Sequence, residues 1–373
     1  MVLDQMFEST SPPAFENEDD GSGSYHENHY ESTSMNIQRA LVIFAFLLVG
    51  VGVISNLIII ISARQLPLIR KKGITTGSRY YIINMSLADL CVLIVASVTN
   101  LAQLLHPWSL GEFMCKLLLP LRDVLILVSL VTITALSLER YLLITRPLQH
   151  QGNKSIAKFV LMCIWLACFL VNGIPLLLVT ELTPVENGSL CRLNYPSKKL
   201  MTIHICFGIA IIMIPFIVVV YCYIAIGIRL KSVYKRRRQT MVPETDEGGG
   251  KNAVTLILRS KRLVKVLTIL VIAFAVCNLP AVLYTLVHFF HTIKRFEHQE
   301  IVFTFFQCMM VYGSAINPLL LLLMASEYRL CITDMKKNLA KARGAFRVHF
   351  TKNQSDQQYC AILKHKNLPV TPL

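Results

Sequence analysis

The stretch that decides the fold is Cys115–Pro147, which reads CKLLLPLRDVLILVSLVTITALSLERYLLITRP. Its interior is apolar except for the adjacent charged residues Arg122 and Asp123, so it is long and apolar enough to cross a bilayer as a helix. Charge at such depth is costly and is usually functional or paired. A thiol at one end and the triplet Glu139-Arg140-Tyr141 at the other suggest a segment that links the two faces of a membrane.

The rest of the chain repeats this apolar pattern. The 373 residues are 54% hydrophobic and 16% charged, whereas an ordinary soluble domain carries about 25% charged residues. Seven apolar runs of roughly 20 residues or more occur, at about 40–63, 80–105, 116–144, 157–180, 200–230, 264–289 and 301–325. They predict an all-α membrane protein, a seven-transmembrane helix bundle.

The net charge of +15 is distributed as a membrane topology signal. Residues 1–38 hold eight acids and no Lys or Arg, whereas 29 of the 37 basic residues fall in alternate loops and the C-terminal tail. By the positive-inside rule the basic loops are cytoplasmic and the N-terminus is extracellular. The charge therefore requires no nucleic acid. We expect a multi-pass protein of the plasma membrane whose first helix directs its own insertion.

Composition also predicts the segments that flank the bundle. Residues 1–38 read as a disordered acidic extracellular tail, either merely solvated or attracting a basic ligand. Residues 39–325 form the seven-helix transmembrane domain. We expect a short amphipathic cytoplasmic helix at 326–340 on the inner leaflet, followed by a cytoplasmic tail at 341–373.

Covalent modifications follow from this topology. None of the eleven cysteines has metal-like spacing, and only Cys115 and Cys191 lie near helix ends on the outer, oxidising side, so we expect a disulfide between them. Asn187 stands in an outer Asn-Gly-Ser sequon and is the expected glycosylation site. Cys331, in the amphipathic helix, is a weaker candidate for lipidation.

Asp89 is the only acid between Glu31 and Glu112 and falls near the middle of the second apolar run. A carboxylate at that depth must be protonated, paired or facing a hydrated cavity, and a cation site is its natural functional interpretation. An enzyme is not expected, because no nucleophile, base and orienting group occur at recognisable spacing.

Several helices each carry a distinguishing residue, and the ordered set resembles the rhodopsin-like class of G-protein-coupled receptors over about residues 40–340. The marks are Asn56, the LADL containing Asp89, Cys115, Glu139-Arg140-Tyr141, Trp165, Pro215, Tyr223, Cys277 with Pro280, and Asn317-Pro318. The resemblance implies a seven-helix receptor that acts on heterotrimeric G proteins and arrestin within membrane lipid.

Within that class the chain resembles the peptide receptors. Leu121-Arg122-Asp123 is similar to the corresponding stretch of neurotensin receptors, with a looser likeness to ghrelin-type receptors. Amine receptors have an aspartate where Arg122 stands, which disfavours an amine ligand. A retinal pigment needs a lysine in the seventh helix, and none occurs between Arg295 and Lys336. The expected ligand is therefore an extracellular neuropeptide or peptide hormone.

The resemblance also assigns candidate site residues. Those facing the outer cavity by helix position are Gln103, Arg122, Asp123, His204, Tyr284, His288, Phe303 and Gln307. Those implied in switching or G-protein coupling are Glu139, Arg140, Tyr141, Tyr223, Phe274, Asn278, Pro280, Asn317 and Pro318. An allosteric sodium pocket is implied at Asn56, Asp89, Ser129, Ser314 and Asn317, with no other cofactor or metal.

Two questions stay open at the level of sequence. The Arg122 guanidinium in an apolar cavity invites either a peptide carboxylate or the neighbouring Asp123. Asn278 and Leu321 replace the tryptophan and the tyrosine usual in the class, which either raises basal activity or weakens signalling. A peptide-binding receptor that does not couple, such as a decoy, is thus the main alternative. A transporter would show internal repeats between halves, and none is visible.

Overall fold

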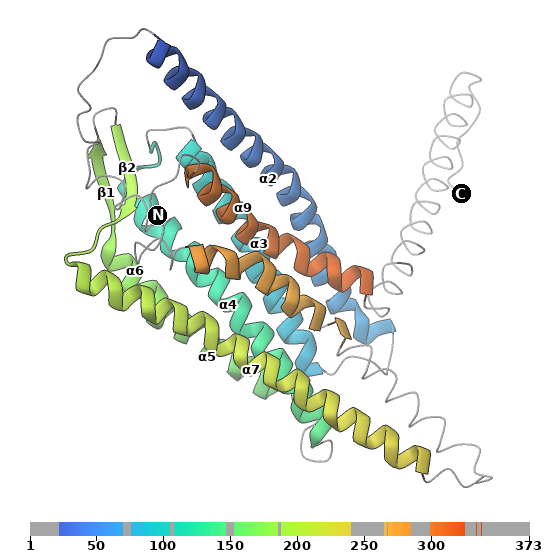
Figure 1. Ribbon diagram of the computed structural model, residues 1–373. Helices are drawn as coiled ribbons and strands as arrows, with labels where there is room; N and C mark the ends of the chain where they lie inside the picture. Colours follow the sequence, from blue (N-terminus) through green and yellow to red (C-terminus); the bar gives the residue numbers. More distant parts are fainter. Residues whose placement is uncertain are drawn as a thin grey trace, which may run out of the picture.

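The computed structural model describes residues 22–69, 76–104, 108–146, 153–185, 188–239, 265–266, 268–284, 299–324, 333 and 337. Figure 1 shows the helices packed side by side as an elongated bundle. Their bounds are α2 Ser22–Ile69, α3 Thr76–Leu104, α4 Gly111–Thr145, α5 Lys154–Cys168, α6 Ile174–Val179, α7 Lys198–Gln239, an unlabelled helix Thr268–Tyr284 and α9 Gln299–Met324.

These helices account for the seven apolar runs. Within the described part of the chain, five spans are long and apolar enough to cross a membrane, at 46–65, 77–102, 111–145, 154–179 and 198–229, while Thr268–Tyr284 and Cys308–Met324 are shorter apolar helices. The fourth span contains α5, α6 and the helical turn between them. The described residues therefore contain the predicted seven helices. The amphipathic helix expected at 326–340 lies almost entirely outside the described residues.

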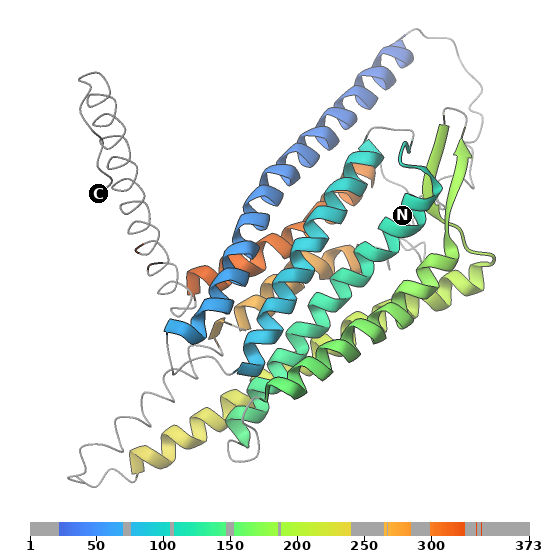
Figure 2. The same cartoon turned by 180° about the vertical axis from the view of Figure 1, so that it is seen from behind.

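The helix α4 occupies the interior of the bundle. It packs against α3, α5, α6, α7 and the outer strands, as the two opposite views of Figures 1 and 2 show. Its buried face includes Val128, Ile133 and Leu136, which join the main apolar cluster between the helices. Exposed side chains such as those of Phe159 and Met162 are also apolar, as expected where a helix meets lipid. The chain is organised around the segment that the sequence singled out.

The first helix is longer than predicted. Residues 22–38, expected to belong to the disordered tail, are helical and continuous with the apolar part of α2. The stretch 24–38 contains neither glycine nor proline. Once the apolar part has nucleated a helix, each further residue adds one backbone hydrogen bond without a new nucleation cost. Composition alone underestimated this continuation.

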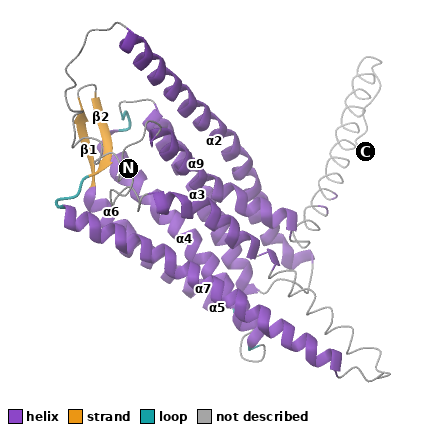
Figure 3. Ribbon diagram, viewed as in Figure 1, coloured by secondary structure: helices purple, strands orange, loops and turns teal. Residues whose placement is uncertain are grey.

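The fourth span is interrupted by a π-helical turn, η1, at Phe169–Gly173 between α5 and α6. After α6 the chain forms an antiparallel hairpin of β1, Thr180–Val185, and β2, Gly188–Leu193, with Thr180 opposite Leu193. Figure 3 shows the hairpin at one end of the bundle, beside α6. The sequence predicted an outer loop here and gave no indication of strands.

Candidate functional site

The end of the bundle that carries the hairpin is fastened by the predicted disulfide between Cys115 and Cys191, which is confirmed, with Cα atoms 5.6 Å apart. It attaches β2 to the first turn of α4, next to the buried ring of Trp108. The Trp108 Nε1 donates to the Gly111 carbonyl (2.9 Å), and its backbone N–H donates to the Ser189 carbonyl (2.8 Å). Hairpin and helix end therefore form one unit.

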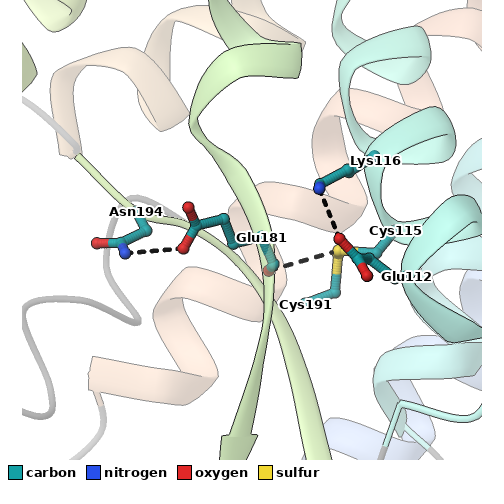
Figure 4. Close-up of polar contacts among 6 residues, drawn as sticks. All are labelled: Glu112, Cys115, Lys116, Glu181, Cys191 and Asn194. Carbon is teal, nitrogen blue, oxygen red and sulfur yellow. Dashed lines mark hydrogen bonds and ion pairs between the residues drawn. A yellow bond between two sulfur atoms is a disulfide. The ribbon is translucent and has the colours of Figure 1, made fainter. Parts of the chain in front are cut away.

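Figure 4 shows the polar contacts around this disulfide. The Lys116 ammonium pairs with the Glu112 carboxylate at 2.6 Å one turn away on α4. The Asn194 amide donates to the Glu181 carboxylate at 2.9 Å, which holds the chain after β2 against β1. Both contacts are exposed and screened by solvent, and only the Asn194–Glu181 bond helps to fix the hairpin's position.

Beneath the hairpin lies a cavity of about 260 Å³. It is enclosed by α4, η1, β2, α7, the helix Thr268–Tyr284 and α9, and along α4 it extends from Leu119 to Leu130. Eleven residues of helix correspond to about 16 Å of depth. The polar side chains in its lining are those of Arg122, Asp123, Asn172, Tyr195, His204, Asn278 and Tyr284. Most of the remaining lining is aliphatic or aromatic, which is the usual composition of a ligand pocket.

The two charged lining residues contact each other. The Arg122 Nε donates to the Asp123 Oδ1 at 2.8 Å, with side chains 12% and 33% exposed. A guanidinium has five N–H donors, so this bond leaves its terminal nitrogens able to bind a further acceptor. The pair as a whole carries no net charge.

A second polar pair in the lining comes from the chain after β2 and from α7. The Tyr195 hydroxyl and the His204 Nδ1 are 2.8 Å apart, and their rings meet edge to face with centroids 5.6 Å apart. Burial raises the pKa of the Tyr195 phenol, and the Asp123 carboxylate adds to the rise. The phenol is therefore neutral at physiological pH and available as a hydrogen-bonding group.

Four of the eight predicted ligand residues, Arg122, Asp123, His204 and Tyr284, line this cavity together. Gln103, Phe303 and Gln307 lie in α3 and α9, but their side chains are not among those described, and His288 lies outside the described residues. Sequence reasoning missed Asn172, Tyr195, Phe306 and Met310. Asn172 alone gave a signal, as a single amide within the apolar run 157–180.

A polar cluster lies deeper in the bundle around Asp89. Its Oδ1 accepts from the Ser129 hydroxyl at 2.8 Å and its Oδ2 from the Asn317 amide at 3.2 Å. The Ser314 hydroxyl bonds to the same carboxylate. The Asn56 amide donates to the backbone carbonyls of Gly52 (3.0 Å) and Ser314 (3.2 Å). The five residues implied as a sodium pocket are thus brought together and buried.

This cluster fits a hard cation. The amide oxygens Asn56 Oδ1 and Asn317 Oδ1 are buried and accept no hydrogen bond from the described residues. Together with the Asp89 carboxylate they supply oxygen ligands, which hard cations prefer. Among the described residues no group of three His, Cys, Asp or Glu side chains is placed to bind a metal. The cluster thus offers neutral amide oxygens and one carboxylate as donors.

Near the C-terminal end of α4, Glu139 and Arg140 are both buried. The Ser78 hydroxyl on α3 bonds to the Glu139 carboxylate. The Tyr223 hydroxyl on α7 lies 3.1 Å from the Ser137 hydroxyl, one turn before Arg140. The Tyr141 ring meets Tyr221 with centroids 6.1 Å apart. The acid, the arginine and the tyrosine of α7 are therefore assembled where α3, α4 and α7 meet.

The two residues that depart from the usual pattern are also buried. The Asn278 amide donates to the Phe274 carbonyl at 2.8 Å, and its side chain lines the cavity. Leu321 packs in the main apolar cluster with Phe274. Asn278 is therefore part of the cavity as well as a candidate switch residue, while Leu321 serves packing. Pro280 and Pro318 lie in the helices that carry these two residues.

A buried network joins three helices at the level of the main core. The Trp165 Nε1 on α5 donates to the Asn84 Oδ1 on α3 at 2.8 Å, and the Asn84 amide donates to the Thr132 hydroxyl on α4 at 2.9 Å. Asn84 is 9% exposed. Each of its polar atoms has a partner, as burial requires.

The modification sites expected at Asn187 and Cys331 lie outside the described residues.

The chain matches the 7 transmembrane receptor (rhodopsin family) over residues 55–321, which is more than half of its length. It therefore belongs to this family, and the resemblance given by the ordered helix marks is confirmed. Membership also makes it a multi-pass membrane protein.

Individual relatives are more distant. The chain is 25% identical to mouse and 28% identical to human neuromedin-U receptor 1, over 70% and 71% of its own length. These matches span 66% of each relative, just under two thirds. It is 26% identical to rabbit neuropeptide Y receptor type 6 over 80% of both chains.

Proposed function

We propose that this protein is a plasma-membrane receptor for an extracellular peptide and that it transmits binding to heterotrimeric G proteins. The observation that carries the proposal is the placement of two sites on one helix. Arg122 lines the cavity, and Arg140 lies at the other end of α4 among Tyr223 and Ser137. Eighteen residues of helix separate them by about 27 Å. The relatives named for neuromedin-U and neuropeptide Y support a peptide as the ligand.

The mechanism is a shift between two states. A ligand changes the equilibrium only by binding one state more tightly than the other. The helix Thr268–Tyr284 lines the cavity through Asn278 and Tyr284 and contains Pro280, which removes a backbone hydrogen bond and makes the helix bendable. Outward movement of its inner end opens a cleft beside Arg140 for a G protein. Arrestin is proposed to bind in the same cleft. Membrane lipid is proposed to surround the apolar outer face of the helices.

Arg122 is proposed to bind the peptide directly through its terminal nitrogens. Arg122→Ala removes these donors, whereas Asp123→Ala removes only the partner of Nε. Arg122→Ala should therefore lower the potency of an activating peptide much more than Asp123→Ala. Equal and small effects in a concentration–response assay would count against direct recognition.

Sodium is proposed to bind at Asp89 and to favour the inactive state. The buried Asn56 and Asn317 oxygens and the Asp89 carboxylate would hold the ion. Asp89→Asn removes the charge but keeps the shape, so peptide binding to this variant should no longer depend on sodium. Sodium dependence equal to that of the parent protein would reject the site.

The experiment that tests the function as a whole is nucleotide exchange. Membranes carrying the receptor are mixed with purified G proteins and screened with secreted peptides, and binding and exchange are measured together. Acceleration of exchange by a bound peptide supports the proposal. Binding without exchange on any G-protein class favours the non-coupling alternative, which the replacements Asn278 and Leu321 keep open.

A further inference from the structure

We propose that Asn172 determines ligand specificity by hydrogen bonding to a neutral carboxamide of the peptide. This rests on the proposed function, and it adds a recognition element on the fourth span to those on α4.

The π-helical turn η1 has identifiable causes in the sequence. The Ile174 N–H bonds to the Phe169 carbonyl, five residues back. Pro175 has no N–H and cannot bond to the Val171 carbonyl, which loosens the helix at this point. Gly173 packs against α4 so closely that a Cβ there would lie 3.0 Å from the Val124 Cγ2. A wide turn that brings the backbone against α4 is therefore built into this segment.

The turn directs one polar side chain to the cavity. Asn172 lines the cavity, while its neighbours Leu170 and Val171 are 49% and 38% exposed on the outside of the bundle. Single π-helical turns within α-helices occur frequently at functional sites, because they rotate the residues that follow. One residue of this turn is thus presented to a ligand, and those before it are presented to lipid.

The Asn172 amide makes no hydrogen bond to the described part of the chain. It lies in a cavity wall with Leu127, Leu176 and Ile212. Its side chain is half-buried, so a ligand that covers the amide must replace the water there with a hydrogen bond. By contrast, the buried Asn84 amide is used internally, because it bonds to Trp165 and Thr132. A polar group without an internal partner, directed to a cavity, is available for a ligand.

The chemistry of the cavity selects the partner. An asparagine amide both donates and accepts, so it pairs best with a group that does the same, such as another carboxamide. The Arg122–Asp123 ion pair carries no net charge, so the described lining has no uncompensated Lys or Arg that would favour a carboxylate. A site of this kind, built to hydrogen-bond a substrate group, discriminates strongly against analogues that lack the group.

The first test concerns placement and needs no ligand. Asn172→Cys and the control Val171→Cys are treated on intact cells with a membrane-impermeant methanethiosulfonate reagent, with the parent protein as background. Asn172→Cys should be labelled at least about tenfold faster than Val171→Cys, since only the former faces the cavity. Equal labelling of the two variants would overturn the proposal.

The second test concerns recognition. Two synthetic peptide pools differ only in carrying carboxamides (amidated C-termini, Asn, Gln) or the matching carboxylates (free C-termini, Asp, Glu). The purified parent should retain the carboxamide pool preferentially. Asn172→Leu, of similar volume, should lose about tenfold of that preference, and Val171→Leu should keep it. Retention without preference overturns the assignment of Asn172 alone. If the parent retains neither pool, peptide recognition fails as well, and the proposed function fails with it.

Discussion

Gly52 allows α2 to approach α3 and α9 closely, and its replacement has a calculable effect. A Cβ at this position would lie 2.7 Å from the Leu93 Cδ1, 2.8 Å from the Ala315 Cβ and 3.1 Å from the Ala315 Cα. Carbon atoms in van der Waals contact are about 3.5–4.0 Å apart. Gly52→Ala therefore forces α2 outward by about an ångström, and overpacking of this kind costs about 1–3 kcal/mol.

Gly50 is the matched control, because a Cβ there would meet nothing within 4 Å. Both replacements gain the same helix propensity, up to about 1 kcal/mol. Gly50→Ala should therefore be neutral or stabilising, and Gly52→Ala should be less stable than Gly50→Ala by about 1–3 kcal/mol. The Gly52 carbonyl also accepts from the Asn56 amide, so the shift disturbs the polar cluster around Asp89.

The assay is thermal denaturation of the two purified variants side by side in the same detergent, followed by loss of the monomer peak in size-exclusion chromatography. The melting temperature of Gly52→Ala should be several degrees below that of Gly50→Ala. Equal melting temperatures would show that α2 adapts to a Cβ at no cost, and the close packing of these helices would then be incorrectly described.

Three further predictions follow from other contacts. Cys115→Ser opens a covalent loop of 76 residues, which removes up to about 4 kcal/mol of stabilisation, so peptide binding at the cell surface should fall sharply. Cys206→Ser, which removes an exposed free thiol, should leave binding unchanged. If Cys115→Ser binds peptide as well as the parent under non-reducing conditions, this prediction is contradicted. Trp165→Phe leaves the Asn84 Oδ1 without its donor and should cost about 1–3 kcal/mol in thermal denaturation, so an unaltered melting curve would argue against the bond. Because the pKa of Tyr195 is raised, its phenol stays protonated over about pH 6–9, and Tyr195→Phe should weaken binding equally across that range; a loss confined to one end would contradict it.

The seven helices were predictable from the sequence because each apolar run is long enough to span a bilayer. A soluble protein does not need apolar runs of this length. It also predicted the disulfide, since only Cys115 and Cys191 were expected near helix ends on the oxidising side, and the bond between them is present. The extension of α2 to Ser22 was not predictable in this way. The polar composition of residues 22–38 indicates that they cannot form a core of their own. A helix that has already formed can nevertheless extend through such residues until one of them breaks it.

The candidate site was only partly predictable, for a similar reason. Arg122, Asp123 and His204 were placed by helix position, and the structure brings them to one cavity. Tyr195 was missed because it lies between β2 and α7, where no periodicity indicates direction. Asn172 was missed because a regular α-helix would point its side chain in a different direction. The π-helical turn at Phe169–Gly173 changes that direction. Helical periodicity in a sequence does not predict local irregularities of the backbone.

The central claim is that the cavity beside Arg122 and the inner site at Arg140 belong to one two-state device. It is tested most directly by measuring peptide binding and G-protein nucleotide exchange on the same reconstituted receptor and on its Arg140→Ala variant. The account predicts that a bound peptide accelerates exchange on the parent, and that the variant binds this peptide but no longer accelerates exchange. Unaltered exchange by the variant would contradict the claim, as would a peptide that binds in the cavity of the parent without changing exchange.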